Sequence, residues 1–214
     1  MEHEWRTRRM KKPARTGRSA KNSNMDGRAK LDIDFWDTDA GKFISRAKCF
    51  LEAAYVLDDK MHDGRSGMLF APALHLTGHG LELMLKGCLL HNGLPKKKAI
   101  SYGHDVNQMW DHDLVAPMRQ AARVNAGISF QMALEAKRFP DTHKVDDPVA
   151  LFDEYRIALG ALHAEQKHYP IRYPTDVDRV APRTPLLVAA LWRTADDYVK
   201  RPGEFSTRGY PPVL

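Results

Sequence analysis

The sequence contains little cysteine and no long apolar run. Cys49 and Cys88 are the only cysteines in 214 residues, which is too few for the disulfide framework of a small secreted protein. Both lie in apolar helical patterns, so we expect two reduced and buried thiols. No stretch approaches the roughly 18 to 20 uncharged residues of a membrane span, and no apolar segment follows the charged N-terminus. We therefore expect a cytoplasmic protein with no membrane anchor.

Strand patterns are also lacking. No segment alternates apolar and polar residues over the length of a strand, and no internal repeat occurs. Apolar residues instead recur every three or four positions, which is the spacing of one helix face. Helices are predicted at 39–61, 68–91, 105–117, 118–124, 129–138, 147–167 and 186–200. We expect an all-α protein, an up-and-down four-helix-type bundle with extra short helices.

Two connections of this predicted bundle are less well defined. The segment from Leu94 to Tyr102 holds three consecutive lysines and is interpreted as a solvated loop. Pro117 either kinks the helix that begins at Asp105 or starts a new helix in its own first turn. Residues 168–185 hold four prolines and are expected to be extended or turning.

Positive charge is concentrated at the N-terminus. The first 30 residues hold ten Lys and Arg against three Asp and Glu, a balance of +7, whereas the whole chain carries +6 and the remainder therefore −1. We expect a disordered basic tail over 1–30, a helical bundle over 31–203 and a C-terminal tail over 204–214. The basic tail either docks on a polyanion such as RNA or precedes a natural start at Met25.

The predicted helix 68–91 is apolar nearly all round, which is typical of the middle of a bundle. At 100° per residue, four of its polar residues fall within a sector of about 60°. They are His75, His79, Glu82 and Lys86. A buried charge is costly unless it is paired. Because Glu82 and Lys86 are four residues apart with the acid first, we expect them to form an ion pair.

Three interpretations of this polar line remain open. It is an internal polar network, or it binds an anionic ligand through Lys86 and a protonated His79. In the third interpretation His75, His79 and Glu82 hold a metal ion, because histidines four apart and a carboxylate one turn on converge. Lys86 on the same line would repel a cation, so we expect no metal ion and no cofactor.

Two motifs follow one another here. The run from His79 to Lys86 reads H-G-x-E-x-x-x-K, and the Gly103-His104-Asp105 turn opens the next helix. An aromatic-proline string with Arg172 and Tyr173 precedes the last helix. Their combination and order resemble the HEPN superfamily, helical domains named for higher eukaryotes and prokaryotes and for nucleotide binding. The resemblance covers roughly residues 40–200.

The resemblance implies an up-and-down four-helix core, frequent dimerisation and two functional styles. Many HEPN domains are metal-independent RNases in toxin, antiphage or RNA-processing systems, and they use an arginine and a histidine separated by four to six residues. Others lack that pair and bind RNA, nucleotides or proteins.

The chain offers two arginine–histidine pairs of this spacing. Arg138 and His143 lie in an expected loop, where nothing in helical geometry fixes the two side chains. Arg156 and His163 are two turns apart on an expected helix, so they share a face. That face also carries Asp153, Gly160 and Lys167, which is typical of a solvated surface.

We therefore expect a helical domain that binds or cleaves RNA or nucleotides, in a stress or defence setting such as a toxin–antitoxin system. An enzyme of this kind would be a metal-independent RNase, with histidine and arginine serving as base, acid and cation. RNA affinity would come from a local basic patch or from the N-terminal tail, with Tyr173 stacking beside Arg172. Residues expected to bind are His75, His79, Glu82, Lys86, His104, Arg172 and Tyr173.

The alternative is a non-catalytic interaction module that uses an apolar helix face to pair with itself or with a partner protein. The expected partners are RNA or a nucleotide, a second copy of the chain in a homodimer, or another protein. A membrane is not among them.

Overall fold

The computed structural model describes residues 35–62, 67–138, 146–164 and 181–207, and in these ranges it contains helices and turns but no strand. This confirms the all-α prediction. The elements are α2 (Asp39–His62), η1 (Gly67–Leu69), α3 (Phe70–His91), α4 (Lys96–Ser101), α5 (Val106–Trp110), η2 (Asp113–Val115), α6 (Ala116–Glu135), α7 (Pro148–Ala164), α8 (Thr184–Lys200) and η3 (Pro202–Phe205).

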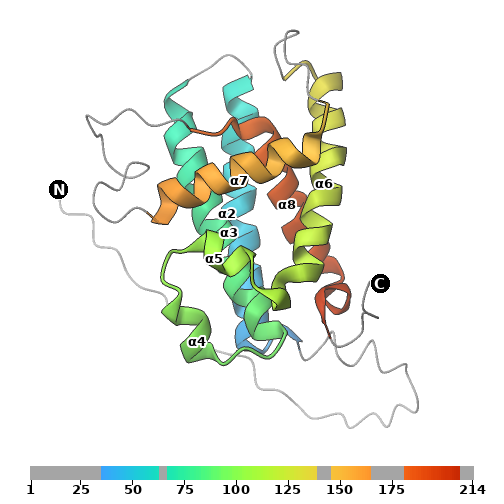
Figure 1. Cartoon of the computed structure of the whole chain (residues 1–214). Coiled ribbons are helices and arrows are strands. Elements are labelled where there is room, and N and C mark those ends of the chain that lie inside the picture. Colours follow the sequence, from blue (N-terminus) through green and yellow to red (C-terminus); the bar gives the residue numbers. More distant parts are fainter. Residues whose placement is uncertain (1–34, 63–66, 139–145, 165–180, 208–214) are drawn as a thin grey trace, which may run out of the picture.

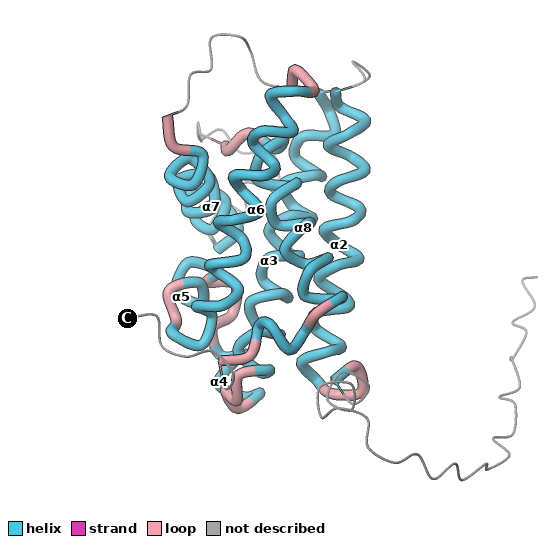
Figure 2. The backbone as a smooth tube through the Cα atoms, turned by 90° about the vertical axis from the view of Figure 1, so that its right-hand side faces the viewer, coloured by secondary structure: helices cyan, strands magenta, loops and turns pink. Residues whose placement is uncertain are grey.

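Four long helices form the bundle. α2, α3, α6 and α8 run alongside one another, up and down, while α7 lies across them and α4 and α5 gather at one end (Figure 1). The view turned by 90° shows α7 on the outside of the four-helix bundle, next to α6 (Figure 2). The expected four-helix-type bundle with extra short helices is therefore confirmed. Among the described helices, none is both long and apolar enough to cross a membrane.

α3 occupies the middle of the bundle. Thirteen of its 22 residues are buried, and it contacts α2, α8, α5, α7 and α4. Apolar residues on nearly every side of this helix explain that position, because each side can be buried against a different neighbour. The prediction of a central helix from its all-round apolar pattern is confirmed.

Two connections differ from expectation. The lysine-rich segment after α3 contains a helix, α4, whose Ala99 packs into the core while its three lysines face outward. Lysine is a good helix former, and a single buried alanine is enough to anchor one short turn. Pro117 lies in the first turn of a new helix, α6, which runs without interruption to Glu135, so the separate short helices expected there are one.

One of the two thiols is not where we expected it. Cys88 is buried, and burial raises the pKa of its thiol to about 12. Cys49 is exposed, which makes the prediction of two buried thiols wrong. On α2 the buried positions include Ala47, Leu51 and Ala54, and Cys49 lies two residues before Leu51, on the opposite side of the helix.

The packed chain continues beyond residue 203. The ring of Phe205 stacks on Tyr198 with centroids 4.0 Å apart. The Asn92 side chain at the end of α3 donates to the carbonyl oxygen of Phe205 at 3.0 Å and accepts from the amide of Thr207 at 2.6 Å. These contacts hold residues 204–207 against the bundle.

α2 and α3 approach closely because two residues of α3 have no side chain. A Cβ at Gly80 would lie 2.7 Å from Leu51 Cγ, and a Cβ at Gly87 would lie 2.6 Å from Ile44 Cδ1. Leu51 and Ile44 are fully buried, so neither has free space into which it could move.

We predict that Gly80→Ala lowers the free energy of unfolding by about 1–3 kcal/mol, because it overpacks this contact. Gly127 is the matched control, since it lies in α6 with open space around it. Gly127→Ala should raise the free energy of unfolding by about 0.5–1 kcal/mol, the ordinary preference of a helix for alanine. Urea denaturation measures both variants. Equal stabilisation by the two substitutions would contradict the close approach of α2 and α3.

Candidate functional site

A carboxylate lies buried in the middle of α3. Glu82 is 4% exposed, and both of its oxygens have partners. Oε1 accepts a hydrogen bond from Lys86 Nζ at 2.6 Å. Oε2 lies 2.8 Å from His163 Nε2 and 2.9 Å from His104 Nδ1. Three parts of the chain, α3, α7 and the turn before α5, therefore meet at one side chain.

Lys86 makes a second contact between α3 and the turn before α5. Its ammonium group donates to Glu82 and also to the carbonyl oxygen of Gly103, at 2.7 Å. Gly103 has a φ of +59°, in the left-handed region that favours glycine, and this aims the carbonyl and the following His104 toward α3. The predicted ion pair of Glu82 and Lys86 is confirmed, and the Gly-His-Asp motif lies against it.

The charge state of Glu82 follows from these contacts. Burial raises the pKa of its carboxyl, but hydrogen bonds from His163, His104 and Lys86 outweigh burial and hold the pKa well below the ordinary value. A carboxylate oxygen only accepts hydrogen bonds, so the imidazole nitrogens that face it carry protons. In a neutral His104 ring the proton is then on Nδ1, and the lone pair is on Nε2.

The buried histidine of α7 fits because α3 has a glycine opposite it. The His163 side chain is 1% exposed, and a Cβ at Gly78 would lie 2.8 Å from its Nδ1. Any larger residue at position 78 would push the imidazole away from the carboxylate.

Arg156, two turns earlier on α7, is buried too. It donates to Asn107 Oδ1 at 2.8 Å, and its guanidinium lies 4.9 Å from the centre of the Trp110 ring. Burial lowers the pKa of this guanidinium. Its Nε has no hydrogen-bond partner among the described residues. These contacts fasten α7 to α5.

The expectation that Arg156 and His163 share a solvated surface is therefore wrong. The buried residues of α7 recur about every three or four positions and are Phe152, Arg156, the pair Leu159 and Gly160, and the pair Leu162 and His163. Asn107 packs directly on Gly160, which leaves no room for a side chain there. The sequence analysis placed Arg156 and His163 on the exposed side of α7 because they are charged or polar. They share the spacing of the apolar residues and lie on the buried side with them. Lys167 lies outside the described residues.

His79 and His104 open the cluster to solvent. The His79 side chain is 34% exposed, with Nδ1 at 3.9 Å from Glu82 Oε2 and its ring perpendicular to that of Phe50. The His104 side chain is 40% exposed. The structure brings together His79, Glu82 and Lys86, which the sequence placed on one line of the helix, and it adds His104 and His163 to them. His75 lies one turn of α3 before His79, half-buried.

A basic and aromatic surface directly precedes His104. Lys96, Lys97 and Lys98 are exposed on α4, and the Lys98 ammonium lies 5.5 Å from the centre of the half-buried Tyr102 ring. Lys96 pairs with Asp39 at 3.0 Å. This lysine helix was missed as part of the site, because the segment was interpreted as a loop. The signal that could have found it is the short distance in sequence from the lysines to the Gly-His-Asp motif.

Other predicted site residues lie elsewhere. Arg138 contacts Asp59 at 2.5 Å and Asp58 at 3.5 Å, near the C-terminal ends of α2 and α6, so it is not part of the Glu82 cluster. Burial raises the pKa of the Asp58 carboxyl there. His143, Arg172 and Tyr173 fall outside the described residues.

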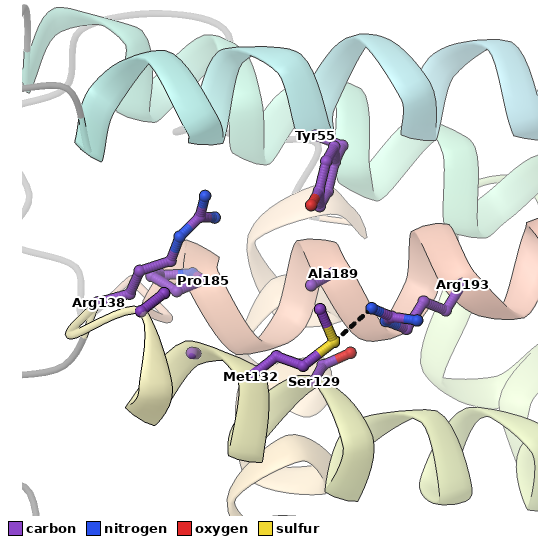
Figure 3. A pocket seen from close by; sticks show the side chains of 9 residues that line it. Tyr55, Ser129, Met132, Arg138, Pro185, Ala189 and Arg193 are labelled. Carbon is purple, nitrogen blue, oxygen red and sulfur yellow. Dashed lines mark hydrogen bonds between the residues drawn. The ribbon is translucent and has the colours of Figure 1, made fainter.

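A pocket of about 100 Å³ lies between α2, α6 and α8. Tyr55 and Met132 face each other across it, Arg138 and Arg193 stand at its two ends, and the hydroxyl of Ser129 has no hydrogen-bond partner among the described residues (Figure 3). Small-molecule sites usually measure about 300 Å³ or more, so this pocket is too small for a nucleotide. The cluster around Glu82 is the stronger candidate.

Known proteins give no further guide to this site. No family model, no curated protein and no solved structure matches the chain.

We predict an asymmetry between the two partners of the buried ion pair. Glu82→Leu should lower the free energy of unfolding by about 3–5 kcal/mol, because it leaves the Lys86 ammonium buried without a counter-charge. Lys86→Met should cost less, since the Glu82 carboxylate keeps both imidazole donors. The double variant should regain much of what Glu82→Leu loses. Urea denaturation of the four proteins checks this, and equal losses for the two single variants would refute the arrangement.

Proposed function

We propose that the chain is a HEPN-like helical domain that binds RNA or a nucleotide and cleaves the RNA backbone without a metal ion. One observation supports this most strongly: the partly exposed imidazole of His104 is held by the buried Glu82 carboxylate and directly follows the lysine helix α4. By the resemblance, such a domain would serve in a stress or defence system.

His104 is suited to act as a general base. Glu82 holds its Nδ1–H, which fixes the tautomer and directs the Nε2 lone pair away from the carboxylate. A base in this orientation can take the proton of a ribose 2′-hydroxyl. His163 and Lys86 hold Glu82 from the other sides, so the orienting carboxylate cannot turn away.

His79 supplies a second imidazole on the same carboxylate. In the proposed reaction the 2′-oxygen attacks phosphorus and the bond from phosphorus to the 5′-oxygen breaks, which leaves a 2′,3′-cyclic phosphate. His104 accepts the 2′ proton, and a protonated His79 donates one to the leaving 5′-oxygen. Two imidazoles balance the protons, so the step needs no metal ion.

The lysine helix provides a binding surface of suitable chemistry. Lys97 and Lys98 are exposed cations for the phosphates, and Tyr102 offers a ring on which a base can stack. This is the local basic patch that an otherwise neutral bundle needs for RNA affinity.

Arg156 and His163, the pair suggested by the resemblance, are assigned positioning roles. Both side chains are buried, so RNA does not reach them in this conformation. His163 holds Glu82, and Arg156 fastens α7 against α5.

We predict that the chain cleaves single-stranded RNA in the presence of EDTA. His104→Ala should lower the cleavage rate by about 10²–10⁴-fold, the usual contribution of a positioned acid or base. Lys97→Ala with Lys98→Ala should raise KM and change kcat little, because these lysines bind phosphates away from the reacting bond. His62→Ala is the matched control, because His62 is partly exposed at the end of α2, and it should leave the cleavage rate unchanged. An activity that survives His104→Ala, or no cleavage by the parent protein, would contradict the proposal.

A second candidate function, the non-catalytic interaction module, is favoured by a stripe on α6. Val124, Ile128 and Met132 are each about half exposed and lie four residues apart, so they share one face of the helix. A face of this kind suits contact with another helix, such as that of a second copy.

We predict that Ile128→Asp reduces any self-association of the chain, because it places a charge in the middle of this stripe. Light scattering over a concentration series measures the mass in solution. Val56→Asp is the control, since Val56 is an equally exposed apolar residue on α2. A parent protein that stays monomeric at all concentrations would exclude pairing through α6, and a dimer that never cleaves RNA would favour this function over the first.

A further inference from the structure

We propose that the cluster around Glu82 also binds a zinc ion, through His79, Glu82 and His163, and that this ion blocks the RNA-cleaving site. The inhibition of RNA cleavage by zinc rests on the proposed function, whereas the binding of zinc does not. Binding depends only on where the described structure places three donor atoms.

These donor atoms converge from two helices. His79 Nδ1, Glu82 Oε2 and His163 Nε2 all lie within 4.8 Å of one another. The ligands of a tetrahedral zinc ion, with bonds of about 2.0–2.1 Å, are about 3.4 Å apart. His163 Nε2 at 2.8 Å from Oε2 and His79 Nδ1 at 3.9 Å from it fall on either side of that value. Shifts of about half an ångström therefore bring each nitrogen to the ligand spacing from Oε2. The two nitrogens themselves lie within 4.8 Å of each other.

Lys86 does not prevent this binding. The sequence argued against a metal ion because Lys86 lies on the same line of α3. In the folded chain its ammonium contacts the other carboxylate oxygen, Oε1, and the carbonyl of Gly103. The two oxygens of Glu82 are thus divided, with the cation on Oε1 and the imidazoles on Oε2. Lys86 holds the carboxylate in place and leaves Oε2 for an ion.

The donor set favours zinc over the alkaline-earth ions. Two imidazole nitrogens with one carboxylate oxygen are typical zinc ligands, whereas Mg²⁺ and Ca²⁺ prefer oxygen. Coordination requires a lone pair on His163 Nε2, so its proton moves to Nδ1. The partly exposed His79 provides the route by which the ion enters.

A bound ion would remove both proposed proton carriers. Zinc on Nδ1 keeps the His79 ring neutral, so the ring cannot form the imidazolium that the proposed reaction needs as its acid. His104 Nδ1 is 2.9 Å from Oε2, so it either becomes the fourth ligand or loses the partner that orients it. Zinc is therefore an inhibitor of this site, and a chelator restores the activity.

The test uses the untagged full-length chain, with zinc binding measured by calorimetry and Co²⁺ absorption as a report of tetrahedral geometry. We expect one tight ion per chain. Gly78→Ala should weaken binding by about 10–100-fold, as does the loss of an outer partner at other metal sites, because the new methyl group displaces His163 without removing a ligand. His79→Ala should weaken it further. His62→Ala and Gly127→Ala should leave it unchanged, and circular dichroism checks the fold of each variant.

The possible results separate the two proposals. No zinc binding by the parent chain, or equal binding by His79→Ala and the parent, overturns the metal site whether or not RNA is cleaved. Binding with the expected variant order supports the site even if the chain never cleaves RNA in EDTA, a result that would refute only the proposed function. Cleavage that continues when the site is saturated with zinc overturns the inhibition of RNA cleavage by zinc.

Discussion

The buried carboxylate of Glu82 is the interaction on which the rest of this structure depends. A charge in the middle of an apolar helix is costly unless it is paired and hydrogen-bonded. Here Lys86 neutralises it, and the two imidazoles of His104 and His163 occupy its other oxygen. These partners come from three separate parts of the chain, so satisfying one carboxylate fixes the position of α7 and of the turn before α5.

The packing of the bundle prepares this arrangement. Gly80 and Gly87 let α2 approach one side of α3, and thirteen residues of α3 are buried. Gly78 and Gly160 then make room at the other contact, the first for His163 and the second for Asn107. The same network leaves His79 and His104 partly open to solvent. A fixed carboxylate between two accessible imidazoles is an arrangement that suits proton transfer.

Local patterns in the sequence predicted more than long-range contacts did. The apolar periods predicted three of the four long helices, α2, α3 and α8, but divided α6 into separate short helices. The spacing of Glu82 and Lys86 predicted their ion pair. The inward direction of Arg156 and His163 was not predicted, since the stripe that they share with Phe152 and Gly160 identifies a face but not the side that is buried. Contacts such as His163 with Glu82 join residues far apart in the chain, and no local spacing encodes them. The lysine helix was missed because its six residues include a single buried one, Ala99, which is too few to give an apolar period.

The most direct test of this account is the protonation pattern of the two imidazoles that face Glu82. Nitrogen-15 NMR at mildly alkaline pH distinguishes which ring nitrogen of each neutral histidine carries the proton. The structure requires the proton on Nδ1 in His104 and on Nε2 in His163, and both sets of signals should shift in Glu82→Gln. A His104 ring with its proton on Nε2, or histidine signals that do not respond to Glu82→Gln, would contradict the central role of this carboxylate.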